Sequence, residues 1–163
     1  MAVPPRVLIT RTAADHLGGL QQRHGPVMFH QSGGCCDGSS PMCYPDGDFI
    51  VGDRDVLLGL LDVSCERQPD GVPVWISGPQ FDAWQHTQLV IDLVAGRGGG
   101  FSLEVPDGVR FLARGRAFTE PELTALAQVP ALTGADYERG LAPPGPRGAV
   151  VAEAADVCPV PNR

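Results

Sequence analysis

Lysine is absent from the chain: all twelve basic residues are arginine, against nineteen acidic residues, and the formal net charge is −7 at pH 7. Nucleic acids and anionic membranes are bound mainly through basic surfaces, so this balance argues against either as the main partner. No apolar run is long enough to span a bilayer. The first residues, Met-Ala-Val-Pro-Pro-Arg, lack the apolar core of a signal peptide. We therefore expect a cytoplasmic protein, whose thiols stay reduced.

Signatures of common enzyme classes are also missing. Gly98-Gly99-Gly100 lacks the Lys-Ser/Thr that completes a phosphate-binding loop. His86 has neither a serine nucleophile in an elbow nor a carboxylate partner with recognisable triad context. No pair of carboxylates stands out for acid–base catalysis. The sequence therefore favours a binding or accessory protein over an enzyme.

Glycine and proline, by contrast, are abundant, with 21 and 16 residues in a chain of 163. This composition favours a turn-rich architecture over a helical bundle, and the length fits one domain with a real core. We predict an α+β fold, in which residues 1–129 form a single compact, β-rich globular domain with a few short helices. Residues 130–163 are rich in Pro, Gly and Ala and are predicted to be an extended tail, ordered only if it packs on the domain or on a partner.

Apolar periodicity and capping signals predict three helices and eight strands. A helix capped by Thr12 should run to about His24, a second should span Pro79–His86, and Thr119 with Glu122 has capping-box spacing for a third. In the strand Pro26–Gln31, alternation places Val27 and Phe29 on one face and Met28 and His30 on the other. The predicted strands are Val7–Thr10, Pro26–Gln31, Asp48–Val51, Asp55–Val63, Val72–Ser77, Gln88–Val94, Phe101–Val105 and Val109–Ala113.

Three of the five cysteines lie close together in the segment Ser32–Cys43, hereafter the cysteine segment. Cys35, Cys36 and Cys43 are soft thiol ligands for zinc, iron or an iron–sulfur cluster. Three thiolates need a fourth ligand. His30, near the end of the strand that precedes the segment, is placed to supply it. We therefore predict a metal site formed by Cys35, Cys36, Cys43 and His30.

Other readings of the cysteine segment remain open. Asp37 or His86 would also serve as the fourth ligand, while the spacing of the cysteines matches no standard zinc-finger or ferredoxin pattern. Oxidation of Cys35 or Cys36 with Cys43 would close a short loop and give a thiol-redox enzyme. In a third interpretation, the thiols are small, partly buried side chains with only a structural role. Cys65 and Cys158 have no neighbours at ligand spacing.

Four stretches of the chain resemble a known bacterial family. The run His24–Tyr44 closely resembles the small proteins labelled "domain of unknown function 779", as do Gly52–Gly59, Trp84–Asp92 and Gly98–Glu104. The resemblance extends from about Ile9 to Phe118. Members are often encoded beside an aldehyde dehydrogenase of the acetaldehyde-oxidising type, which implies a role in supporting aldehyde or alcohol oxidation.

A looser resemblance concerns the HesB-like A-type carriers of iron–sulfur assembly. Ile9-Thr10, Ala13-Ala14, Gly33-Gly34-Cys35, Leu89–Asp92 and Gly100-Phe101 follow the order of that family's motifs. The resemblance implies a HesB-like sheet domain in which Cys35 matches the carriers' first cysteine. The carriers have a C-terminal Cys-x-Cys pair, where this chain has only Cys158, so Cys36 and Cys43 would have to replace that pair.

Together these observations predict a cytoplasmic metal- or iron–sulfur-binding protein that acts as an accessory or maturation factor for an aldehyde dehydrogenase. Two alternatives stand beside this hypothesis. One is a thiol-redox enzyme that uses the cysteine segment, and the other is a metal-free module whose glycine-rich loop and Pro-rich tail dock onto the dehydrogenase. Whether the chain forms a homo-oligomer stays open.

Overall fold

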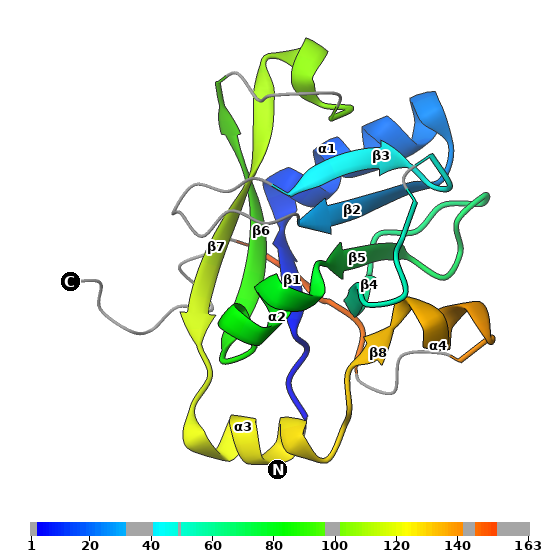
Figure 1. The fold of residues 1–163 in the computed structure, drawn as a ribbon. Coiled ribbons are helices and arrows are strands. Elements are labelled where there is room, and N and C mark those ends of the chain that lie inside the picture. The colour runs from blue at the N-terminus through cyan, green and yellow to red at the C-terminus, as the bar shows by residue number, and fades with distance from the viewer. Residues whose placement is uncertain (1–2, 32–40, 49, 97–101, 142–145, 153–163) are drawn as a thin grey trace.

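A computed structural model describes residues 3–31, 41–48, 50–96, 102–141 and 146–152. These residues form an α+β fold, as predicted, built from two mixed sheets and short helices (Figure 1). The elements are, in chain order, β1 (Val7–Thr10), α1 (Arg11–His24), β2 (Val27–Gln31), β3 (Met42–Pro45), β4 (Val56–Leu61), β5 (Val72–Ile76), α2 (Gly78–Trp84), β6 (Thr87–Ala95), the 3₁₀ helix η1 (Val105–Asp107), β7 (Val109–Ala117), α3 (Glu120–Ala127), β8 (Leu132–Thr133), α4 (Gly134–Glu138) and β9 (Val150–Val151).

The strands are divided between a four-stranded sheet, ordered β7-β6-β1-β9, and a five-stranded sheet, ordered β3-β2-β5-β4-β8. The pairs β1–β6, β1–β9 and β2–β5 are parallel, and the others are antiparallel. The long strands β6 and β7 pair along their whole length, from Thr87 opposite Ala117 to Ala95 opposite Val109. In Figure 1 the upper end of this hairpin extends beyond the edge strand β3 of the five-stranded sheet.

The main core lies between the two sheets and beneath α1. Because both sheets and the helix contribute apolar side chains to one cluster, burial there stabilises their mutual packing. The side chains in this cluster include Val7, Ile9, Leu89, Ile91 and Phe111 from the four-stranded sheet, Val27, Phe29, Cys43, Leu61, Val72 and Val74 from the five-stranded sheet, and Ala13, Leu17 and Leu20 from α1.

Helix α1 forms where it was predicted, but it begins earlier. Thr10, rather than Thr12, is the N-cap: its Oγ1 accepts a hydrogen bond from the backbone N–H of Ala13 at 3.3 Å. Thr12 is the second residue of the helix, two positions after the N-cap, and is too far along for its hydroxyl to accept from the first unpaired N–H groups. Gly25 ends the helix with φ 82°, a left-handed conformation that glycine adopts without a Cβ clash.

Strand β2 follows the predicted alternation. Val27 and Phe29 belong to the core between the sheets, whereas Met28 belongs to a second cluster on the outer face of the five-stranded sheet, with Leu57, Trp75 and Leu132. His30 is opposite Trp75 in the parallel pair with β5, so it shares the outer face with Met28. We call these two sides the inner and the outer face.

Two predicted strands are wrong. The described part of Asp48–Val51 is a turn and irregular chain, and the strand instead forms at Met42–Pro45, where β2 offers an antiparallel edge. The described part of Phe101–Val105 is likewise not a strand but a turn that enters η1. The alternation of polar and apolar residues in this segment does not reflect a strand with an apolar inner face, because its polar residues Ser102 and Glu104 are the buried ones.

Residues 130–152 contribute three elements to the molecule. β8 pairs with β4, α4 follows it directly, and β9 pairs with β1. Gly148 lies between the two sheets: its N–H donates to the Leu60 carbonyl at 2.8 Å, and a Cβ there would approach the Val7 carbonyl oxygen to 2.6 Å. Within the predicted tail, the described residues therefore add strands to both sheets, while residues 142–145 and 153–163 lie outside the described residues. None of the described helices is long and apolar enough to cross a membrane.

Candidate functional site at the base of the cysteine segment

The cysteine segment connects β2 to β3, and its C-terminal end is held inside the core. Cys43 is opposite Phe29 in the antiparallel pair, and both side chains are fully buried on the inner face. Cys43 is a free thiol. Its position in β3 follows from the pairing with β2, because paired residues on adjacent strands point to the same side of a sheet.

A hydrogen-bond network from the turn before η1 holds the backbone of Cys43. The Cys43 N–H donates to Ser102 Oγ at 2.8 Å, and the Leu103 N–H donates to the Cys43 carbonyl at 2.9 Å. The Ser102 hydroxyl donates in turn to Glu104 Oε1, and the Phe111 N–H donates to Glu104 Oε2 at 3.2 Å. With 1% of its surface exposed, Glu104 is a buried carboxyl group whose two oxygens each accept a hydrogen bond.

This environment suppresses thiolate formation at Cys43. Burial raises the pKa of the Cys43 thiol well above its ordinary value, and the nearby Glu104 carboxylate raises it further. Only the thiolate is a good nucleophile or metal ligand. The inner face therefore keeps Cys43 as a protonated core side chain.

On the outer face, the end of β2 carries a buried histidine with an acidic partner. His30 Nε2 lies 3.1 Å from Asp55 Oδ2, and His30 is 4% exposed. The same oxygen accepts the Gly52 N–H at 2.9 Å, which fixes the carboxylate just before β4. A carboxylate bonded to one ring nitrogen is the arrangement that orients metal-bound histidines.

The last residue of β2 is a buried amide. The side chain of Gln31 is fully buried, yet neither its Oε1 nor its Nε2 has a hydrogen-bond partner. An unpaired buried amide costs about 1–3 kcal/mol. By strand alternation it lies on the inner face, so β2 presents polar groups on both faces where the cysteine segment begins.

Of the four predicted metal ligands the structure describes Cys43 and His30, and it does not bring these two together. Cys43 and His30 lie on opposite faces of the same strand pair. His86 is exposed and lies just before β6. It is seven residues, or roughly 23 Å of extended chain, from Leu93, which pairs with Phe111, the residue that donates to Glu104. Cys35, Cys36 and Asp37 lie outside the described residues. Within the described ranges, no group of three or more His, Cys, Asp or Glu side chains is placed to hold a metal ion.

Sequence reasoning missed three residues of this region. Asp55 only begins the predicted strand Asp55–Val63, and Ser102 and Glu104 fall within the predicted strand Phe101–Val105. The sequence Phe101–Val105 does contain a signal for them. Ser102 and Glu104 alternate with apolar residues, and burying such polar side chains is costly unless each has a hydrogen-bond partner. Nothing in the sequence indicates that Asp55 lies beside His30, since the contact joins residues 25 positions apart.

Comparison with curated proteins and with solved structures found no match. The family model described as "Domain of unknown function (DUF779)" matches residues 16–117. The matched region contains β2, β3, the cysteine segment, Asp55, Ser102 and Glu104, that is, every residue of the candidate site. The chain belongs to the DUF779 family.

Proposed function

We propose that this protein binds a zinc or iron ion, or an iron–sulfur cluster, through Cys35 and Cys36 with His30 as a further ligand, and that it serves an aldehyde dehydrogenase as a cytoplasmic accessory or maturation factor. The observation that carries the proposal is the buried His30–Asp55 pair, five residues before Cys35. The proposal drops Cys43 from the predicted ligand set, because its buried thiol is held protonated on the other face.

The geometry of the described residues supports the remaining set. The Asp55 contact at Nε2 orients the His30 ring, as carboxylates orient metal-bound histidines. The cysteine segment begins immediately after β2 and ends in β3, so the pairing of His30 with Met42 holds both of its ends next to the histidine. The adjacent cysteines supply two soft ligands. The aldehyde dehydrogenase is proposed as the partner because of the family resemblance. The likeness to A-type carriers stays a prediction of the same kind.

Metal analysis tests the proposal directly. The anaerobically purified full chain should carry about one equivalent of zinc or iron, and Co²⁺ added to the metal-free protein should give thiolate-to-metal absorption. Both signals should disappear in Cys35→Ser/Cys36→Ser. The matched control is Cys65→Ser, the same substitution at a partly exposed cysteine outside the segment. Asp55→Asn should weaken Co²⁺ binding by about 10- to 100-fold, because it changes the hydrogen-bond partner that orients a metal-binding histidine.

Three outcomes would contradict the proposal in different ways. Metal far below one equivalent, or unchanged after Cys35→Ser/Cys36→Ser, rules out the thiolate site. A low-pKa thiol that iodoacetamide labels rapidly, without bound metal, would favour the thiol-redox enzyme. Co-purification with the dehydrogenase that survives loss of both cysteines would favour the metal-free binding module.

A further inference from the structure

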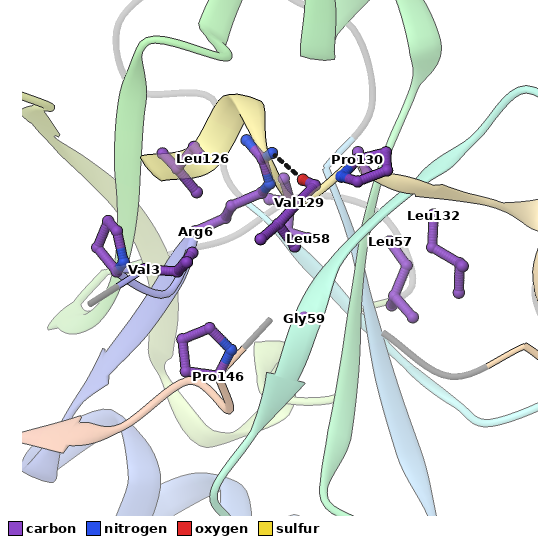
Figure 2. Close-up of a pocket in the computed structure, with 12 residues that line it drawn as sticks. Val3, Arg6, Leu57, Leu58, Gly59, Leu126, Val129, Pro130, Leu132 and Pro146 are labelled. Atoms are coloured by element: carbon purple, nitrogen blue, oxygen red, sulfur yellow. Dashed lines mark hydrogen bonds between the residues drawn. The ribbon is translucent and has the colours of Figure 1, made fainter. Parts of the chain in front are cut away.

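A groove lies between the N-terminal residues and β4. Its walls come from residues before β1, from β4, from the connection between α3 and β8, and from Pro146 (Figure 2). The empty space measures about 370 Å³, part of it open to solvent. The groove is a shallow surface hollow and not an enclosed cavity, so a bound molecule lies along its walls.

The lining is apolar except for one charge. Arg6 carries the only charged side chain among the lining residues, and the rest are aliphatic residues, prolines and glycine. Leu57, Leu58, Leu126, Val129, Leu132 and Pro146 form the walls around it.

The guanidinium of Arg6 is held in place but not neutralised. Its Nη2 donates to the Val129 carbonyl at 3.1 Å, and its Cζ lies 5.5 Å from the centre of the Phe81 ring. A guanidinium has five N–H donors, so one hydrogen bond leaves most of them to other acceptors. Among the ion pairs of the described residues, none involves Arg6, whereas Arg23, Arg114, Arg116, Arg139 and Arg147 each have an acidic partner.

Burial without a counter-ion is costly for a cation. Arg6 is half-buried, and this burial lowers the pKa of its guanidinium from the ordinary value. The protein as a whole repels anions because its net charge is −7, so general electrostatics would not concentrate them here. An anion that binds in this groove must be recognised locally, by the fork of Arg6.

We propose that this groove is a binding site for a small aliphatic monocarboxylate, whose carboxylate pairs with Arg6 and whose tail lies against the leucine walls. A guanidinium matches a carboxylate in a two-pronged geometry. With a single cation and no second basic residue in the lining, the groove fits one negative charge better than a phosphate ester. The apolar walls select a hydrocarbon tail over a hydroxylated one. The proposal is independent of the metal site.

Titration with carboxylates of increasing length tests the site. Sodium acetate, butyrate and hexanoate are added to the full chain, and amide shifts are followed by ¹H–¹⁵N NMR. We expect saturable shifts around Arg6, Leu58 and Val129, with affinity rising by about two- to fourfold for each methylene that becomes buried. Hexan-1-ol, which has the same tail without the charge, should bind much more weakly.

Substitutions separate the charge from general effects. Arg6→Gln should raise the Kd for hexanoate at least tenfold, equivalent to about 1.4 kcal/mol. Arg11→Gln removes the same charge from an exposed position and should leave the Kd unchanged. Arg6→Lys keeps the charge without the fork and should retain part of the affinity, which also covers the case in which the glutamine variant folds poorly.

Several results would overturn the proposal. These are the absence of saturable shifts with hexanoate, equal affinity in Arg6→Gln and the parent chain, or equal affinity for hexanoate and hexan-1-ol. If Arg6→Gln instead shifts the resonances of residues 153–163 while hexanoate has no effect, the groove holds the chain's own C-terminal segment. A dependence of the shifts on protein concentration alone would assign it to a second copy of the chain.

Discussion

The inner and outer faces of the β2–β3 pair use the same strands for opposite purposes. On the inner face, Cys43 is fully buried, its backbone is bonded to Ser102, and its thiol stays protonated. On the outer face, His30 lies beside the carboxylate of Asp55, next to the cysteine segment. One residue of register separates the two environments, since successive side chains of a strand point to opposite sides. Proximity in sequence to a cysteine cluster is therefore a poor guide to which thiols can react.

The largest effect should come from removing the carboxyl group that supports the inner face. Glu104→Ala leaves the Ser102 hydroxyl and the Phe111 N–H without acceptors and opens a cavity in the core. We expect a loss of about 3–5 kcal/mol in the free energy of unfolding, measured by urea denaturation. Glu104→Gln keeps the volume and one acceptor oxygen and should cost clearly less. Equal losses in the two variants would mean that shape, and not hydrogen bonding, holds this network.

Cys43→Ser should be the next most damaging change. It puts a hydroxyl into an apolar environment and should cost about 1–3 kcal/mol, whereas Cys65→Ser at a partly exposed turn should stay within about 0.5 kcal/mol. Similar losses of stability in the two variants would show that burial on the inner face does not make Cys43 more sensitive to substitution than Cys65.

The raised pKa of the Cys43 thiol also predicts a pH dependence. Above about pH 8.5 the thiol of the unfolded chain loses its proton while the folded one keeps it, so the folded state binds more protons. Its stabilising contribution is complete below that pH and declines as the pH rises, by at most about 1.4 kcal/mol per pH unit. Urea denaturation from pH 7 to 10 should show this decline in the parent chain, and Cys43→Ala should remove it. An identical decline in both proteins would contradict the assignment to Cys43.

On the outer face, Asp55→Asn should have a smaller effect on stability. Asparagine keeps an oxygen for the Gly52 N–H but loses the charge opposite His30, so we expect a loss of about 1 kcal/mol in urea denaturation. Asp53→Asn, at an exposed neighbouring position, is the matched control and should be neutral. If Asp55→Asn changes neither the stability nor the Co²⁺ affinity, the Asp55 carboxylate does not orient the His30 ring.

The smallest expected effect concerns the helix that lies on the outer face. The ring of Tyr137 in α4 meets Trp75 edge-on, with 5.4 Å between ring centres. Tyr137→Ala should cost about 0.5 kcal/mol, and Tyr137→Phe, which keeps the ring, should be close to neutral. Tryptophan fluorescence and urea denaturation would measure both. No loss with alanine would mean that α4 does not contribute to this face.

Local rules predicted the elements whose stabilising contacts are themselves local. The alternation of Val27, Met28, Phe29 and His30 assigned side chains to the correct faces, and the capping box of Thr119 and Glu122 begins α3 as expected. The two wrong strand predictions involve partners far away in the chain. β3 forms because β2 offers it an edge, and Ser102–Val105 leaves the extended conformation because Ser102 and Glu104 bond to Cys43 and Phe111.

Composition and motifs by themselves determined the fold class, the family and the place of the cysteine segment, because these depend on residue type and on short-range periodicity. Only the tertiary structure decided which side chains share an environment. It separated Cys43 from His30, joined His30 to Asp55, paired Glu104 with Ser102, and left Arg6 in an apolar groove without an acidic partner. Each of these contacts depends on sheet register and on the packing of distant segments, and a linear pattern carries no direct record of either.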